Sequence, residues 1–293
     1  MAEITAELVK TLRERTGAAM MDCKRALVAS QGDIETAIEA MRKAGQAKAD
    51  KKADRVAAEG IIATARSTDG KQAAIVDLNC ETDFVARSDD FKHFAETVAT
   101  AALTHQVTES EKLLTIKLAQ GETVDEVRRN LIAKLGENIQ IRRVSYIASD
   151  TAVGTYTHSG RIGVLVRLTP SNEDLAKDIA MHIAASHPIV INATEVPATL
   201  VEKEKEIFMA QATTSGKPAA IIEKMVSGRI KKYLDEVSLL GQPFVKDPEL
   251  TVEQLLNKHQ AKVIQFTRFA VGEGIEKKAD NFVEEVMAQA RGA

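Results

Sequence analysis

The feature that most constrains the fold of this 293-residue chain is an internal repeat. Each copy begins with two short, β-branched apolar runs joined by a turn that contains glycine, which is the pattern of a β-hairpin. The two hairpins cover residues 60–78 and 154–168. A helical pattern follows each hairpin, and a second helical pattern later runs into a third strand. Two copies of hairpin, helix, helix and strand predict two related α+β subdomains packed together.

The helices and third strands of the two copies follow the same order. The first helices are expected over 90–102 and 174–186, and the third strands over 139–144 and 264–269. Apolar and polar residues alternate in these third strands, as they do where the two sides of a strand meet different surroundings. We therefore expect each sheet to have one buried face and one solvated face.

The second copy carries an insertion between its two helices, over residues 197–240. One apolar stripe lies within 200–208 and another within 222–233, and a turn at 215–218 separates them. Two such stripes predict an antiparallel helical hairpin that projects as a coiled coil.

Three short helical patterns open the chain, over 5–15, 21–30 and 33–44. Gly17, Gly32 and Gly45 follow them, and glycine is the usual residue just beyond a helix end. Three helices of this length predict a small bundle with a marginal core. The Lys-, Ala- and Asp-rich stretch over 42–55 has no apolar stripe, so we expect a solvated linker there, with part-helical structure as an option.

These patterns predict an α+β fold with six regions. They are a three-helix module (1–45), a linker (46–55), a first α+β subdomain (56–145), a second α+β subdomain (146–196 and 241–272), the inserted hairpin (197–240) and a C-terminal helical module (273–293). In the last region Asp280, Phe282, Val283 and Val286 mark a helix whose apolar stripe has to dock on another surface.

The composition excludes several classes of protein. The formal net charge is -3, and no basic face or aromatic-rich strand is apparent, so direct nucleic-acid binding is not expected. No apolar run reaches membrane-spanning length, and no signal segment opens the chain. The only cysteines, Cys23 and Cys80, do not form a close motif. Two scattered thiols are typical of a reducing cytoplasm, where we expect the protein to act.

Motifs for catalysis or for small ligands are also missing. His182 and His187 are five residues apart, so on a helix they diverge by about 140° and do not chelate a metal as an i,i+4 pair does. The Gly-Lys pair at 216–217 lacks the rest of a phosphate loop, and 272–274 lacks the third glycine of a dinucleotide site. We therefore expect no active site, no metal, no cofactor and no bound nucleotide, and a function in binding another protein.

One stretch places an aromatic residue between a strand and a helix. Residues 75–78 are predicted as a buried strand, and a helix is predicted to begin after an N-cap at Ser88. Between them Thr82-Asp83-Phe84-Val85 is predicted as a short loop. An aromatic side chain in such a loop is either tucked into the core or offered to a partner, and the tucked arrangement is the commoner one.

This stretch resembles the Thr-Asp-Phe-Val signature of the bacterial elongation factor Ts family, whose members are nucleotide exchange factors for the GTPase elongation factor Tu. Further blocks that resemble the family follow in its order over nearly the whole chain. They cover residues 12–24, 158–166, 181–186 and 271–276. The resemblance implies an N-terminal module of the ubiquitin-associated type, and release of GDP from elongation factor Tu as the function.

The resemblance also implies residue roles. Phe84 would be a wedge between helices of the GTPase domain, Asp83 would disturb the Mg²⁺ surroundings, and Thr82 and Val85 would shape the loop. The other implied contacts with the partner are Arg13, Met20, Met21, Lys24, Leu135, Gly136, His158 and Val245.

Some of these contacts have other interpretations. Met20 and Met21 could fill a core, but neighbouring helical positions do not both face inward, so we expect one at the surface. An exposed turn histidine accounts for His158 equally well. Leu135 replaces the family's Ile, and Lys246 follows Val245 where the family has an apolar residue. The alternative function is a helical scaffold that binds ribosome- or polymerase-associated proteins without exchange activity.

Overall fold

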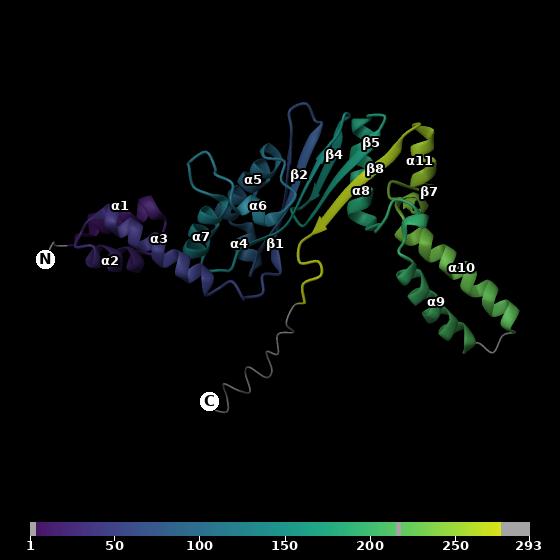
Figure 1. Cartoon of the computed structure of the whole chain (residues 1–293), viewed down its shortest axis with the longest axis horizontal. Helices are drawn as coiled ribbons and strands as arrows, with labels where there is room; N and C mark the ends of the chain where they lie inside the picture. The colour runs from purple at the N-terminus through teal and green to yellow at the C-terminus, as the bar shows by residue number, and fades with distance from the viewer. Residues whose placement is uncertain (1–3, 215–217, 277–293) are drawn as a thin grey trace.

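The computed structural model describes residues 4–214 and 218–276, apart from the side chains of 46–48. The molecule is elongated: three N-terminal helices lie at one end, two antiparallel sheets lie in the middle, and a two-helix arm projects at the other end (Figure 1). The mixed α+β class is confirmed.

The N-terminal helices are α1 (Ala6–Thr16), α2 (Met20–Ala29) and α3 (Ile34–Asp50). Their ends follow capping chemistry. The Thr5 hydroxyl accepts a hydrogen bond from the Leu8 N–H at 3.3 Å, and Gly17 ends α1 with φ of 65°. The Asp33 carboxylate accepts one from the Thr36 N–H at 2.6 Å. The buried side chains between the helices are Val9, Leu12, Cys23, Leu27 and Ala37.

The third helix was predicted to end at Gly45, and this is wrong: it continues to Asp50. Gly45 is buried, and a Cβ there would lie 3.2 Å from the Cβ of Ala133 in α7 (Val124–Leu135). The missing side chain therefore allows close packing of two helices. Ala49 is buried in the core of the first sheet and its helices. The predicted linker is thus helical as far as Asp50 and docked at Gly45 and Ala49, whereas most side chains of 50–55 are exposed.

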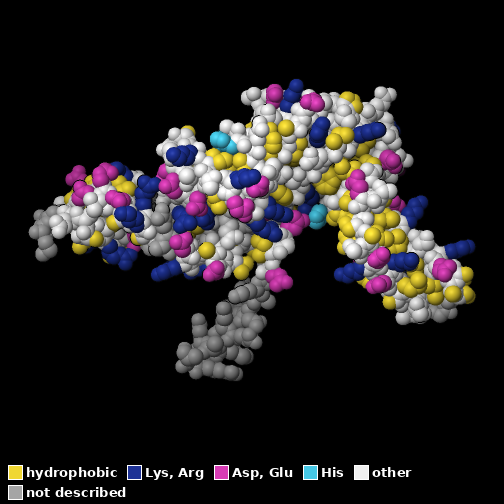
Figure 2. Space-filling model, viewed as in Figure 1, with side chains coloured by type: hydrophobic (Ala, Val, Ile, Leu, Met, Phe, Trp, Pro, Cys, Tyr) yellow, Lys and Arg dark blue, Asp and Glu magenta, His cyan; other side chains and the backbone are white. Residues whose placement is uncertain are grey.

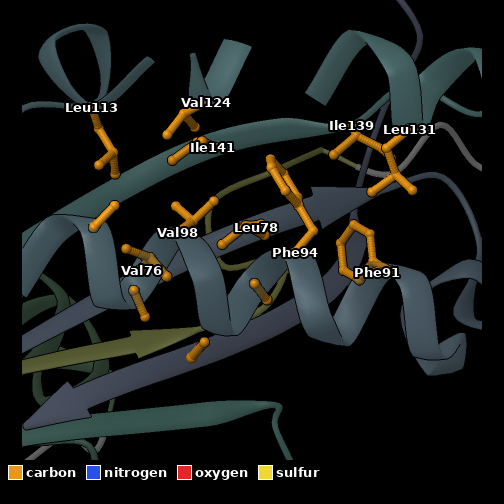
Figure 3. Close-up of a cluster of buried hydrophobic side chains, with 14 of the residues drawn as sticks. Val76, Leu78, Phe91, Phe94, Val98, Leu113, Val124, Leu131, Ile139 and Ile141 are labelled. Atoms are coloured by element: carbon orange, nitrogen blue, oxygen red, sulfur yellow. The ribbon is translucent and has the colours of Figure 1, made fainter. Parts of the chain in front are cut away.

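The first sheet contains β1 (Glu59–Arg66), β2 (Gln72–Cys80) and β3 (Gln140–Ala148), in that order and antiparallel. The helices packed with it are α4 (Asp83–Arg87), α5 (Asp89–Thr104), α6 (Ser110–Leu114) and α7. Phe91 and Phe94 of α5 share a buried cluster with Leu78 of β2 and Ile139, the residue before β3 (Figure 3). This core fixes the strand and helix that flank α4.

The second sheet has the same order, β4 (Val153–His158), β5 (Ile162–Thr169) and β8 (Lys262–Ala270). It packs with α8 (Glu173–Ser186), and α11 (Val252–Lys258) and a small hairpin of β6 (Pro243–Phe244) and β7 (Asp247–Thr251) adjoin it. The pairing register shifts between Asp77 and Leu78 in the first sheet and between Arg167 and Leu168 in the second. The irregularity falls at corresponding places, as expected for a repeat.

The prediction that one face of each sheet is solvated is wrong, because the two sheets pack on each other. Ile62 and Ile75 of the first sheet share a buried cluster with Leu165 of the second. A Cβ on Gly163 would lie 2.5 Å from Cγ2 of Ile62, and the Ile62 N–H donates to the Gly160 carbonyl at 2.7 Å. Alternation along a strand does not reveal whether water or another sheet covers its second face.

The inserted segment forms α9 (Ala198–Thr213) and α10 (Ala219–Val237), which run side by side (Figure 1). The predicted helical hairpin is therefore present, and its coiled-coil geometry stays a prediction. Hydrophobic side chains gather on the surface of this arm (Figure 2), where Leu200, Ile207 and Ile221 are exposed. Residues 215–217 of the predicted turn, and the predicted C-terminal helix after 276, lie outside the described residues. Within the described ranges, no helix has the length and hydrophobicity that crossing a membrane requires.

Candidate functional site

The predicted loop at Thr82–Val85 is instead the start of a short helix, α4. The Thr82 hydroxyl accepts a hydrogen bond from the Val85 N–H at 3.4 Å and begins the helix. Ser88 ends α4 by donating its hydroxyl to the Val85 carbonyl at 2.8 Å, and it caps α5 by accepting from the Phe91 N–H at 3.4 Å. Two capping residues this close together leave room for one helical turn.

Phe84 lies at the surface of α4, with 83% of its area exposed. Val85 and Ala86, the next two residues, are buried and hold α4 on the core. Successive helical residues point about 100° apart, so Phe84 faces outward when these two face inward. The commoner, tucked arrangement of the ring is therefore not present here, and an exposed aromatic of this size is typical of a binding surface.

Asp83 lies beside Phe84 in the first turn of α4. Its carboxylate pairs with the guanidinium of Arg87 at 2.9 Å, and the two side chains are 44% and 79% exposed. An exposed i,i+4 pair contributes little to stability. The carboxylate is therefore free to exchange this partner for another cation.

Glu137, which the sequence analysis missed, holds the start of α4. Its Oε2 accepts the backbone N–H groups of Glu81 at 3.1 Å and Thr82 at 2.9 Å, and its Oε1 accepts the Thr82 hydroxyl at 2.5 Å. The signal for it is a carboxylate one residue beyond Gly136, the left-handed residue that ends α7. Negative charge is unfavourable at a helix C-terminus, so such a residue indicates a partner elsewhere in the chain.

The thiol of Cys80 lies next to the same turn and donates to the Thr82 carbonyl at 3.2 Å. Burial, together with the negative charges of Glu137 and Glu59, raises the pKa of Cys80 to about 12. The thiol therefore stays protonated near neutral pH and is not a nucleophile. Its role at this site is structural.

The structure brings the predicted Leu135 and Gly136 next to the predicted wedge. Gly136 is exposed, and its carbonyl accepts a hydrogen bond from the Lys52 ammonium. Leu135 is partly buried against the first core. Because the residue that follows them, Glu137, bonds to Thr82, this helix end and α4 form one surface.

The four predicted contact residues of the N-terminal module, Arg13, Met20, Met21 and Lys24, are all exposed. Met20 and Met21 expose 58% and 64% of their areas. The expectation that at least one of them lies at the surface is confirmed, and in fact both do. The inward positions of α2 are occupied by Cys23 and Leu27 instead.

His158 lies exposed at the end of β4, where its Nδ1 is 3.2 Å from the Tyr156 hydroxyl. Val245 lies between β6 and β7 and is 44% exposed. Lys246 pairs with Asp178 at 2.5 Å and is thereby held on the second subdomain.

The buried side chain of His182 positions Val245. Its Nδ1 accepts the Val245 N–H at 3.2 Å, so its Nε2 carries the proton that is shared with the Gln242 Oε1 at 3.0 Å. Burial lowers the pKa of His182, which keeps the ring neutral. The spacing of His182 and His187 excluded a shared metal, and the role of His182 in the structure is structural.

Comparisons with known proteins place these features in a family. The family model described as Elongation factor TS matches residues 81–273. Proteins named elongation factor Ts from Legionella pneumophila (strain Paris), Methylococcus capsulatus and Francisella tularensis subsp. novicida are 59%, 58% and 57% identical to the chain. These similarities cover 99%, 98% and 100% of this chain, and 100%, 99% and 100% of those proteins. The chain belongs to the elongation factor Ts family.

As a member of the elongation factor Ts family, the chain is a translation elongation factor. The family match begins at Glu81, beside the Thr82 cap, and extends past β8. The N-terminal module lies outside that match and is covered by the full-length relatives.

The contact residues expected for the elongation factor Ts family are spread along the molecule and not gathered in a cleft. In Figure 1, α2 lies at one end, α4 near the middle, and β7 at the other end. No cluster of His, Cys, Asp or Glu within the described ranges is suited to a metal ion. This arrangement fits a partner of protein size that contacts several elements at once.

Proposed function

We propose that this elongation factor Ts family member binds the GTPase elongation factor Tu in its GDP form and promotes GDP release without an active site of its own. The observation that carries the proposal is the 83% exposure of Phe84 on a short, doubly capped helix. Free aromatic surface of this kind becomes favourable only when a partner buries it.

The physical basis of exchange is differential binding. A GTPase holds GDP through phosphate contacts and Mg²⁺. A partner weakens GDP only if it binds the nucleotide-free form more tightly, and bound GDP then weakens the partner by the same factor. Phe84 would separate helices that the nucleotide and its metal hold in place, and Asp83 would compete in the Mg²⁺ surroundings, while Thr82 and Val85 would keep the turn in shape.

The remaining contacts would hold the partner during this step. Arg13, Met20, Met21 and Lys24 would grip the GTPase domain, and Leu135 and Gly136 would extend the surface around Phe84. His158 in the second sheet and Val245 beside β7 would contact the partner away from the N-terminal module. Such contacts set affinity, whereas the inserted ring sets how far GDP binding is weakened.

The direct test is the Phe84→Ala variant. Burial of a Phe side chain contributes about 1.5–3 kcal/mol, so GDP release at saturating factor should slow by about 10- to 150-fold. The measurement is the loss of fluorescent GDP from elongation factor Tu. The melting temperature should stay unchanged because the ring packs on no core.

The matched control is Ile264→Ala, which removes an exposed apolar side chain from β8. This variant should release GDP at the wild-type rate. A wild-type rate for Phe84→Ala would remove the wedge from the mechanism. A scaffold without exchange activity is distinguished by a second measurement: addition of GDP with Mg²⁺ should dissociate the complex of an exchange factor and leave that of a scaffold intact.

A further inference from the structure

The helix that carries Phe84 is too short to be stable by itself. α4 has five residues, and an isolated helix of this length does not form in water because nucleation fixes several dihedral angles for one hydrogen bond. Its order therefore has to come from contacts with the rest of the molecule. The apolar contacts are those of Val85 and Ala86 on the inner side.

The polar contacts at the start of α4 converge on one carboxylate. We propose that Glu137 is the positioning residue that presents Phe84, an inference that rests on the exchange function proposed above. The carboxylate accepts two consecutive backbone N–H groups and the Thr82 hydroxyl, all within 3.1 Å. Hydrogen bonds to an ionised acceptor are about twice as strong as neutral ones.

Glu137 is itself held in place by its neighbours. The Asn138 N–H donates to the Glu81 carboxylate at 2.6 Å, so each of the two turns caps the other. The buried side-chain amide of Asn138 donates to the carbonyls of Ala53 at 3.1 Å and Arg55 at 2.8 Å. The carboxylate of Glu137 therefore belongs to a rigid junction between α7, the segment after α3, and α4.

This junction acts before the partner arrives. A ring that is already held in the inserting orientation loses less conformational entropy when it enters the partner. Loss of Glu137 would leave the docking surfaces of the N-terminal module and of the second sheet intact, and it would loosen only the turn that carries Phe84. Its effect should therefore fall on the maximal rate of GDP release, and the concentration of factor that gives half of that rate should change little.

Three variants test this role. Glu137→Ala removes every acceptor, whereas Glu137→Gln keeps one oxygen for the two N–H groups and can donate its amide to the Thr82 hydroxyl. The control is Glu195→Ala, because one oxygen of Glu195 accepts the consecutive N–H groups of Ile191 and Asn192 in the second subdomain. This variant removes the same kind of hydrogen-bond acceptor at a position distant from α4 in the sequence. All variants are compared at a temperature at which circular dichroism shows them folded.

The first measurement is hydrogen–deuterium exchange of the free protein, followed in the peptide 81–88. Glu137→Ala should speed its exchange, and Glu137→Gln and Glu195→Ala should not. The second is GDP release from elongation factor Tu. Glu137→Ala should lower the maximal rate by about tenfold, since a barrier change of about 1.4 kcal/mol gives that factor, and Glu137→Gln should restore most of it.

The combination with Phe84→Ala separates positioning from general destabilisation. In the Phe84→Ala background, Glu137→Ala should cause no further loss of rate, because the ring through which it acts is absent. Additive losses, or wild-type peptide exchange in Glu137→Ala, overturn the positioning role. If the wild-type protein does not speed GDP release, the proposed function is overturned. The contribution of Glu137 to that function is then overturned as well, whatever the hydrogen–deuterium exchange of the peptide shows.

Discussion

At the scale of single residues, one partly buried and one fully buried polar side chain hold the backbone beside two of the proposed contact residues. Glu137 acts on the turn before Phe84, and His182 acts on the backbone of Val245. Neither residue is among the proposed contacts. Each accepts a backbone N–H that would otherwise be directed into the interior without a partner.

The protonation of His182 should make stability depend on pH. In the unfolded chain the ring titrates near its ordinary value of 6.5, and burial lowers the pKa in the folded protein. As pH falls below about 6.5 the unfolded state binds more protons, so the free energy of unfolding decreases until the folded pKa is passed. The stabilisation is fully present above the unfolded pKa.

The variant His182→Asn checks this expectation, because it keeps an acceptor for the Val245 N–H and does not titrate. Urea unfolding at pH 7.5 and 5.5 should show a larger loss of stability for the wild type than for His182→Asn. All other ionisable groups are common to the two proteins. Equal losses would mean that protonation of His182 is not coupled to folding.

At the scale of elements, the ends of helices show what sequence patterns reveal and what they hide. Ser88 was predicted as a cap and is one, since a side-chain oxygen before a helix acts locally. The role of Gly45 could not be predicted, because a glycine that ends a helix and a glycine that allows close packing of a neighbouring helix look the same in sequence. Glu137 was missed because its partners lie far away in the chain.

The close packing of α3 on α7 should be sensitive to volume at Gly45. Gly45→Val would place branched methyl groups where a Cβ alone is 3.2 Å from Ala133, and overpacking typically costs about 1–3 kcal/mol. The control is Ala44→Val on the exposed side of the same helix, which should change stability by about 0.5 kcal/mol or less. Thermal unfolding measures both, and equal effects would contradict the packing role.

At the scale of the whole molecule, the repeat was predictable but the contact between its copies was not. The hairpins and helices followed from local periodicity. The second face of each sheet appeared solvated because polar residues alternate in β3 and β8. Charged side chains of these strands in fact lie near the contact between the two sheets. The guanidinium of Arg143 in β3 lies 2.8 Å from Asp77 in the first sheet and 3.1 Å from Glu273 beyond the second.

A pair of glycine substitutions should show the importance of the contact between the sheets. Gly163→Ala would place a Cβ 2.5 Å from Ile62 and 2.9 Å from Ile75, so it should destabilise the protein by about 1–3 kcal/mol. Gly228→Ala in α10 meets nothing within 4 Å and should stabilise by about 0.5–1 kcal/mol through helix propensity. Chemical denaturation measures both, and a stabilising Gly163→Ala would argue against tight contact at this point.

The face shared by the two sheets has a consequence for the order of folding during synthesis. The first copy leaves the ribosome while the strands that cover Ile62 and Ile75 have not yet been translated. Its inner face meets only water until β5 emerges, and β8 completes the opposing sheet only when residue 270 has been added. A nascent chain of this protein therefore exposes an apolar surface until β5 emerges, and a pause before that point would prolong the period in which it can aggregate.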